Sequence, residues 1–180
     1  MIPTLVRGLA LATVAAGVLP AVASADGEAG YVTRNANVLQ FVAYGGYDNN
    51  LTVTVDGNSV VFNDAAGPIL KGSLSCSNSN GGAKCVVPGP TVLGIHLGDG
   101  KNKVISNVAD DDITNVVIAG GSGSTSNHLE HSGRPAEIHG GPGPDTLIGG
   151  NASDALVGGD GNDLLRPRLG SDSVDARSAR

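Results

Sequence analysis

The order of polar and apolar residues along this chain predicts short strands joined by turns. Leu51 to Val55 alternates strictly, as a half-buried strand does, and Asp56-Gly57-Asn58 leads through a turn into a second run, Ser59 to Phe62. Further strands are predicted over 37–44 and 91–97. After residue 25, no stretch of useful length carries the period of a helix. These features predict an all-β chain.

Towards the C-terminus the alternation gives way to a period of nine residues. Residues 140–166 form three copies that each begin with two glycines, and a degenerate fourth copy occupies residues 167–175. An aliphatic residue stands at the eighth position of each copy. A flexible glycine linker would not keep this phase four times over. The sixth position is aspartate in every copy: Asp145, Asp154, Asp163 and Asp172.

The chemistry of one copy explains why copies must cooperate. Glycines at the first, second and fourth positions favour turns with positive φ whose carbonyls point inward. Such a turn and one carboxylate supply about half of the roughly six to eight oxygens that Ca²⁺ takes. If two copies make one turn of a parallel coil, each copy shares an ion with the next copy but one. We expect a better site at Asp145 with Asp163 and a poorer one at Asp154 with Asp172. The backbone is expected to contribute ligands from Gly141, Gly143, Gly159, Asp160, Gly150 and Asn151.

The copies resemble the nonapeptide repeats of the RTX (repeats-in-toxin, hemolysin-type) family. A broader resemblance, to small secreted bacterial calcium-binding proteins of the RTX type, is carried by Asp64 to Pro68, by the two cysteines, by Leu97 to Gly100 and by the repeats, in that order. It implies Ca²⁺ binding outside the cell and no enzymatic activity. The fold expected is an N-terminal small β segment followed by a short right-handed parallel β-roll.

The repeat frame begins before the clean copies. Residues 97–105 fit it with Asn102 in the aspartate position, and residues 120–123 open another frame that decays. Gly98 and Gly141 are out of phase with a period of nine, which predicts an insertion or irregular turn between them. Residues 96–139 are therefore expected to form coil turns that have mostly lost their ligands.

Residues 1–25 have the layout of a secretory signal peptide, with a basic Arg7, an apolar run from Gly8 to Leu19 and small residues at Ala23 and Ala25. The apolar run is too short to span a bilayer, and no later candidate span occurs. Without these residues, 10 basic residues (11 minus Arg7) face 17 acidic ones, which disfavours nucleic acid and anionic membranes as partners. The predicted organisation is 1–25 signal peptide, 26–95 β segment, 96–175 β-roll and 176–180 tail.

Cys76 and Cys85 flank a turn-rich segment, and in an exported chain they predict a disulfide. A two-ligand metal site is less favoured because no histidine lies beside them, and redox catalysis lacks the C-x-x-C spacing.

Other chemistry is less well supported. Three histidines and two glutamates could build a zinc site, although a solvated coil face is the commoner meaning; they are His128, Glu130, His131, Glu137 and His139. Asp110 to Asp112 could add calcium ligands or form an acidic turn. No Gly-x-Ser-x-Gly elbow supports a hydrolase. The alternative functions are a calcium-stiffened adhesion or matrix module with an unidentified cell-surface or polysaccharide partner and, third, an unrecognised secreted hydrolase.

Overall fold

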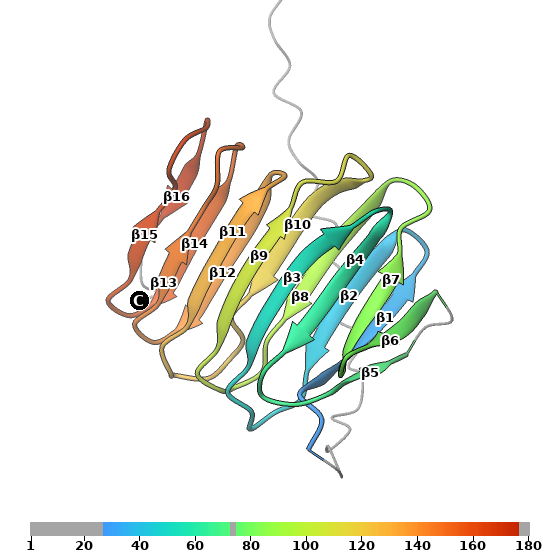
Figure 1. Ribbon diagram of the computed structural model, residues 1–180. Helices are drawn as coiled ribbons and strands as arrows, with labels where there is room; N and C mark the ends of the chain where they lie inside the picture. Colours follow the sequence, from blue (N-terminus) through green and yellow to red (C-terminus); the bar gives the residue numbers. More distant parts are fainter. Residues whose placement is uncertain (1–26, 73–74, 177–180) are drawn as a thin grey trace, which may run out of the picture.

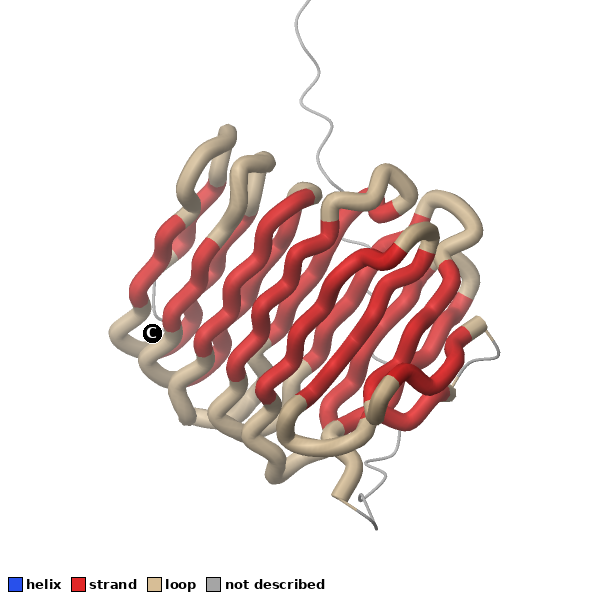
Figure 2. Tube along the Cα trace, viewed as in Figure 1, coloured by secondary structure: helices blue, strands red, loops and turns tan. Residues whose placement is uncertain are grey.

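The computed structural model describes residues 27–72 and 75–176, and every regular element in this part is a β-strand (Figures 1 and 2). The predicted all-β chain is confirmed. Among the described residues there is no helix that is long and apolar enough to cross a membrane. The predicted signal peptide lies outside the described residues, as do residues 177–180 of the predicted tail.

The strands form two sheets of eight, each mixing parallel and antiparallel neighbours. The first sheet has the spatial order β16 (Ser173–Asp175), β14 (Ala155–Asp160), β12 (Ala136–Pro142), β10 (Ile113–Ala119), β8 (Thr91–His96), β2 (Val38–Ala43), β1 (Gly30–Asn35) and β5 (Ile69–Lys71). The second sheet has the order β15 (Leu164–Arg166), β13 (Thr146–Ile148), β11 (His128–Gly133), β9 (Lys103–Val108), β3 (Asn50–Asp56), β4 (Ser59–Asp64), β7 (Gly82–Val86) and β6 (Cys76–Ser79).

From β8 to β16 the chain passes alternately from one sheet to the other. Each strand pairs in parallel with the strand two places further along the chain, so the strand pairs follow one another along the molecule towards the red end in Figure 1. In the repeats this step spans two nonapeptide copies, because Leu129 pairs with Leu147 and Leu147 with Leu165. The preceding step, from Val104 to Leu129, is longer and contains the predicted irregular turn.

The eighth-position side chains fill the space between the sheets. Val104, Leu129, Leu147 and Leu156 are fully buried. Burial of such a side chain contributes about 1.5 to 3 kcal/mol, and here each repeat adds one. The burial declines at the C-terminal end, where Leu165 is partly buried and Val174 is 48 % exposed.

The N-terminal part belongs to the same two sheets. The predicted hairpin is confirmed: β3 and β4 pair antiparallel with Asp56 opposite Ser59. Parallel pairing of β2 with β8 and of β3 with β9 then joins these strands to the later ones. Both sheets therefore continue across residues 95–96, and the division of the chain there stays a prediction.

The predicted disulfide is present. Cys76 and Cys85 face each other across the antiparallel pair β6 and β7, with their Cα atoms 4.0 Å apart, and they are bonded through their Sγ atoms. Both are buried at the end of the molecule opposite the repeats.

The turns between the sheets lie along two opposite borders, where Figure 2 shows the loops. We call the turns that follow β2, β8, β10, β12 and β14 and lead into the second sheet the first edge: residues 44–49, 97–102, 120–127, 143–145 and 161–163. From β9 onward, the turns that lead back to the first sheet form the second edge: residues 109–112, 134–135, 149–154 and 167–172.

Candidate calcium site at the first edge

One polar side chain per turn forms a column along the first edge. The first four members are at most 3 % exposed, and the column runs through Asn49, Asn102, Asn127, Asp145 and Asp163. The Oδ1 atom of each later member accepts a hydrogen bond from the backbone N–H of the member before it. These bonds measure 3.2 Å from Asn49 to Asn102, 3.1 Å from Asn102 to Asn127, 2.7 Å from Asn127 to Asp145 and 2.9 Å from Asp145 to Asp163.

The two aspartates each have a second oxygen that is left over. Asp145 Oδ2 and Asp163 Oδ2 are both buried and make no hydrogen bond. Burying an ionised oxygen without a partner is strongly unfavourable, so the fold requires a proton or a cation at this point.

A main-chain oxygen lies beside the free oxygen of Asp145. A Cβ built on Gly140 would overlap Asp145 Oδ2 and would stand 2.5 Å from the carbonyl oxygen of Gly158, so these two oxygens flank the same small space. In the same way, a Cβ on Gly158 would overlap Asp163 Oδ2. Glycine at the first position therefore leaves room for the carboxylate of the sixth residue.

The electrostatic environment disfavours two free charges. Burial raises the pKa of Asp145 above its usual value of 3.8, the N–H of Asn127 opposes this shift, and the nearby charge of Asp163 raises the pKa further. A hard divalent cation, coordinated by carboxylate and carbonyl oxygens, would remove the repulsion and satisfy the free oxygens together. The donor set at the first edge thus fits Ca²⁺.

A comparison with protein-family models gives a match over residues 137–174 to the RTX calcium-binding nonapeptide repeat, in four copies. Residues 137–174 are therefore RTX-type calcium-binding nonapeptide repeats. These nonapeptide repeats bind Ca²⁺. Neither a curated protein nor a solved structure matches the chain.

The second edge of the RTX repeats treats its aspartates differently. Asp154 is 3 % exposed, and both of its oxygens accept hydrogen bonds: Oδ1 from the N–H of Ala136 at 2.8 Å, and Oδ2 from the N–H of Gly150 at 2.7 Å. Asp172 is partly buried, and its Oδ1 accepts from the N–H of Asp154 at 2.9 Å. The two residues are adjacent, as the repeat predicts, but Asp154 has no free oxygen.

Several predicted backbone ligands have other partners. The carbonyl oxygen of Asp160 accepts from Gly143 at 2.6 Å, and that of Gly150 accepts from Leu169 at 3.2 Å. Gly141 and Gly159 pair across β12 and β14, with φ of +100° and +101°, as second-position glycines were expected to have. The side chain of Asn151 is exposed. These assignments remain predictions.

The carbonyl oxygen of Gly158 was not among the ligands predicted from the sequence. Positive φ was expected at the first-position glycines, yet Gly140, Gly149 and Gly158 do not have it. The signal was available in the sequence, because a first position that admits no side chain indicates that something packs against its Cα.

The histidines do not converge on a zinc site. His139 Nε2 lies 2.7 Å from Glu137, and His128 Nε2 lies 3.8 Å from Glu130. His131 is fully buried, with Nδ1 3.1 Å from Ser106 Oγ and Nε2 2.9 Å from the carbonyl of Arg134. Within the described residues, no three His, Cys, Asp or Glu side chains are grouped to hold a metal, so a site at the first edge must also use main-chain oxygens.

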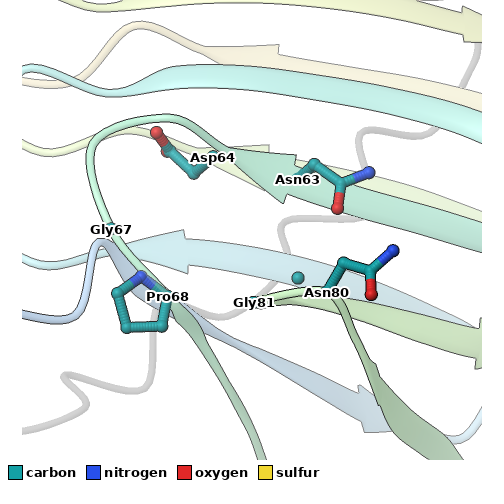
Figure 3. Close-up of a pocket in the computed structure, with 7 residues that line it drawn as sticks. Asn63, Asp64, Gly67, Pro68, Asn80 and Gly81 are labelled. Carbon is teal, nitrogen blue, oxygen red and sulfur yellow. The ribbon is translucent and has the colours of Figure 1, made fainter.

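A small cavity of about 170 Å³ lies at the far end from the repeats, between the end of β4 and the turn joining β6 to β7. Asn63 and Asn80 approach each other from these two elements, and Pro68 closes another side (Figure 3). Asp64 also lines it, but its Oδ1 already accepts from the N–H groups of Asn50 and Ala66. The cavity contains no group that suggests a specific chemistry.

Proposed function

We propose that this chain is an exported protein that binds Ca²⁺ outside the cell and uses it to complete the folding of its C-terminal repeats, without catalysis. The observation that carries the proposal is the pair of buried, unpaired oxygens on Asp145 and Asp163. The buried carboxylate pair destabilises the folded state of the metal-free chain. A bound ion removes this destabilisation, so the free energy of ion binding stabilises the fold.

In this proposal the main ion is held by Asp145, Asp163 and the carbonyl oxygen of Gly158. Residues of one ligand set couple strongly, because losing either carboxylate removes most of the site. Asp154 and Asp172 form the weaker pair, since an ion there would compete with the N–H of Gly150 for Asp154 Oδ2.

We also propose that residues 96–175 form a short right-handed parallel β-roll. Three features support this: the strands alternate between the sheets, neighbours are parallel, and the repeats advance by two copies per turn. Parallel crossover connections within a sheet are almost always right-handed.

The extracellular setting is supported by the sequence. Residues 1–25 have the signal-peptide layout, and RTX-type repeats suit the roughly millimolar calcium that extracellular modules meet. Calcium at cytosolic levels would leave sites of such affinity empty, so the C-terminal repeats would fold only after export.

Calorimetric titration of Ca²⁺ into the purified mature chain tests the proposal. Asp145→Ala and Asp163→Ala should each abolish the tighter binding event, and the double variant should lose little more than either single. Asp111→Asn is the matched control, because it removes a carboxylate whose side chain is fully exposed (100 %) at the second edge.

Circular dichroism gives the folding readout, because β signal should rise as Ca²⁺ is added to EDTA-treated protein. Identical spectra in EDTA and Ca²⁺, or additive losses for Asp145→Ala and Asp163→Ala, would contradict the proposal.

A further inference from the structure

Asparagine amides occupy the N-terminal part of the first-edge column, where they hydrogen-bond to oxygens of the turns. Asn127 Nδ2 donates to the carbonyl oxygen of Gly140 at 3.2 Å. Asn102 Nδ2 lies 2.7 Å from the carbonyl of Gly100 and 3.1 Å from Asn127 Oδ1, with the carbonyl of Gly120 at 3.5 Å. In these turns a neutral amide gathers the surrounding oxygens.

Consecutive turns place these groups in equivalent positions. A Cβ built on Gly120 would overlap the carbonyl oxygen of Gly140 and stand 2.9 Å from Asn127 Nδ2. One turn later, a Cβ built on Gly140 would stand 2.5 Å from the carbonyl oxygen of Gly158 and overlap Asp145 Oδ2. Asp145 Oδ2 thus takes the place that the amide nitrogen of Asn127 has one turn earlier. Asn127 Nδ2 can donate to the carbonyl oxygen that it faces, whereas Asp145 Oδ2 and the carbonyl oxygen of Gly158 are both acceptors.

The surroundings of the asparagines also disfavour a cation. An open groove of about 410 Å³ runs beside Asn102 and Asn127, and its charged lining residues are Lys101, Lys103 and Asp48. Both lysines are exposed, and the excess positive charge that remains after Asp48 is counted raises the free energy of a cation bound nearby.

From these observations we propose that the side-chain amides of Asn102 and Asn127 take over the role of a calcium ion in the first-edge turns 97–102 and 120–127. Turns of the column up to Asn127 are then metal-free, and those from Asp145 onward depend on calcium. The inference rests on the proposed function, because it takes Ca²⁺ to be the ion that Asp145 and Asp163 require. The sixth residue of each first-edge turn decides whether that turn needs an ion.

This arrangement gives the calcium-dependent turns a metal-free support. Asn127 donates its backbone N–H to Asp145 Oδ1 at 2.7 Å, so the first calcium-dependent turn docks on a turn that is complete without an ion. The same hydrogen bonding continues towards the N-terminus, because the N–H of Asn102 donates to Asn127 Oδ1 and the N–H of Asn49 donates to Asn102 Oδ1. Turns up to residue 127 should therefore remain folded in EDTA.

The variant Asn127→Asp tests the inference in the full mature chain. A carboxylate at this position faces the carbonyl of Gly140 without a donor, so the variant should melt at a lower temperature than wild type in EDTA. It should recover in excess Ca²⁺ and bind one more Ca²⁺ per chain by calorimetry. Asn107→Asp changes an exposed position on β9 and is the matched control. It should neither lower the melting temperature in EDTA nor add a bound Ca²⁺.

The reverse variant, Asp145→Asn, tests the same equivalence from the other side. Its amide should donate to the carbonyl of Gly158, as Asn127 does to Gly140, so the variant should lose the tighter binding event and melt above wild type in EDTA. Two results would overturn the inference: Asn127→Asp behaving like Asn107→Asp in EDTA with no added ion, or Asp145→Asn melting below wild type in EDTA.

These outcomes are separable from failure of the proposed function. A wild-type chain that binds no Ca²⁺ would refute the function, whereas the EDTA comparison of Asn127→Asp with Asn107→Asp depends on the amide alone. If Asn127→Asp fails to fold under any condition, Asp145→Asn still decides the question.

Discussion

The two edges of the molecule are built from the same nonapeptide, yet they leave their buried aspartates in opposite states. At the first edge, Asp145 accepts one backbone hydrogen bond and keeps a free oxygen. At the second edge, Asp154 accepts two, from Ala136 and Gly150. The nonapeptide therefore supplies a buried carboxylate at both edges, but it leaves buried carboxylate oxygens without a hydrogen bond at only the first.

The difference comes from the second position of the repeat. Gly141 has a φ of +100° and continues β12, where it pairs with Gly159. Gly150 does not have positive φ and turns its N–H to Asp154 Oδ2. At the second edge, the N–H of the second-position residue Gly150 therefore hydrogen-bonds the buried carboxylate of Asp154. At the first edge, the second-position residue Gly141 takes part in strand pairing instead. Local backbone geometry, which the motif does not determine, decides which buried carboxylate oxygen lacks a hydrogen-bond donor.

The largest effect is expected for Gly140→Ala. The new methyl would overlap Asp145 Oδ2, so the variant should lose the tighter calcium event and about 3 kcal/mol of stability. Gly149→Ala is the equivalent change at the second edge: its Cβ would stand 2.6 Å from the carbonyl oxygen of Pro167 and 2.7 Å from Asp154 Oδ2, so it should also destabilise the fold but leave the tighter calcium event in place. Urea unfolding and calorimetry measure both, and loss of the tighter event in both variants would mean that the edges do not differ as described.

Reduction of the Cys76–Cys85 disulfide should affect both edges equally. The loop between these residues is short, and its closure contributes about 2 to 3 kcal/mol in the chain-entropy estimate. Reduced protein should melt at a lower temperature with an unchanged calcium stoichiometry, measured by calorimetry in the presence and absence of reductant. A changed stoichiometry would show that the disulfide end and the repeats are coupled.

Asp154→Asn should destabilise the second edge whether or not Ca²⁺ is present. Whichever way the new amide turns, its NH₂ faces one of the two N–H groups that Asp154 now satisfies, at a cost of about 1 to 2 kcal/mol. Urea unfolding should show the loss in both EDTA and Ca²⁺. A loss that disappears in EDTA would instead indicate that Asp154 acts mainly as a calcium ligand.

The smallest effect concerns pH. Burial lowers the pKa of His131 below its usual value of 6.5, against opposing effects of its bond to Arg134 and the charge of Asp154. Below that value the unfolded chain takes up a proton that the folded ring resists, so this contribution to stability is complete above pH 6.5 and declines as the pH falls towards the folded pKa. Urea midpoints in EDTA should fall accordingly, and His131→Gln should reduce the slope, part of which remains because burial also lowers the pKa of His96. His128→Gln, which alters a partly exposed ring, should leave the slope intact.

Much of the repeat geometry could be predicted from the sequence because it depends on local chemistry. Spacing alone predicted that Asp145 and Asp163 are neighbours although a whole copy separates them in sequence, and that Asn102 stands in an aspartate position. The alternation of residues 51–55 and the turn after Asp56 predicted the hairpin, and the cysteine spacing predicted the disulfide.

The rest depended on contacts between distant segments. Asn49 joins the column through a hydrogen bond to Asn102, which is remote in sequence, although Gly45 and Gly46 before it resemble the start of a repeat. The pairing of β2 with β8 is equally remote. Which of two identical carboxylates finds an N–H donor depends on the φ of a single glycine, and composition and periodicity carry no information about that angle.

The antiparallel hairpins at one end of the sheets give the molecule a direction of assembly. The pairs β1 with β2 and β3 with β4 close over very short loops, so they form at little entropic cost. Each later pair must close a longer loop onto a strand that is already in place, and it touches mainly its immediate neighbours. We therefore expect the strands to form in order from the N-terminal hairpins towards residue 175. The calcium-dependent turns would be the last to form, so the ambient calcium concentration would control how many C-terminal strands are folded.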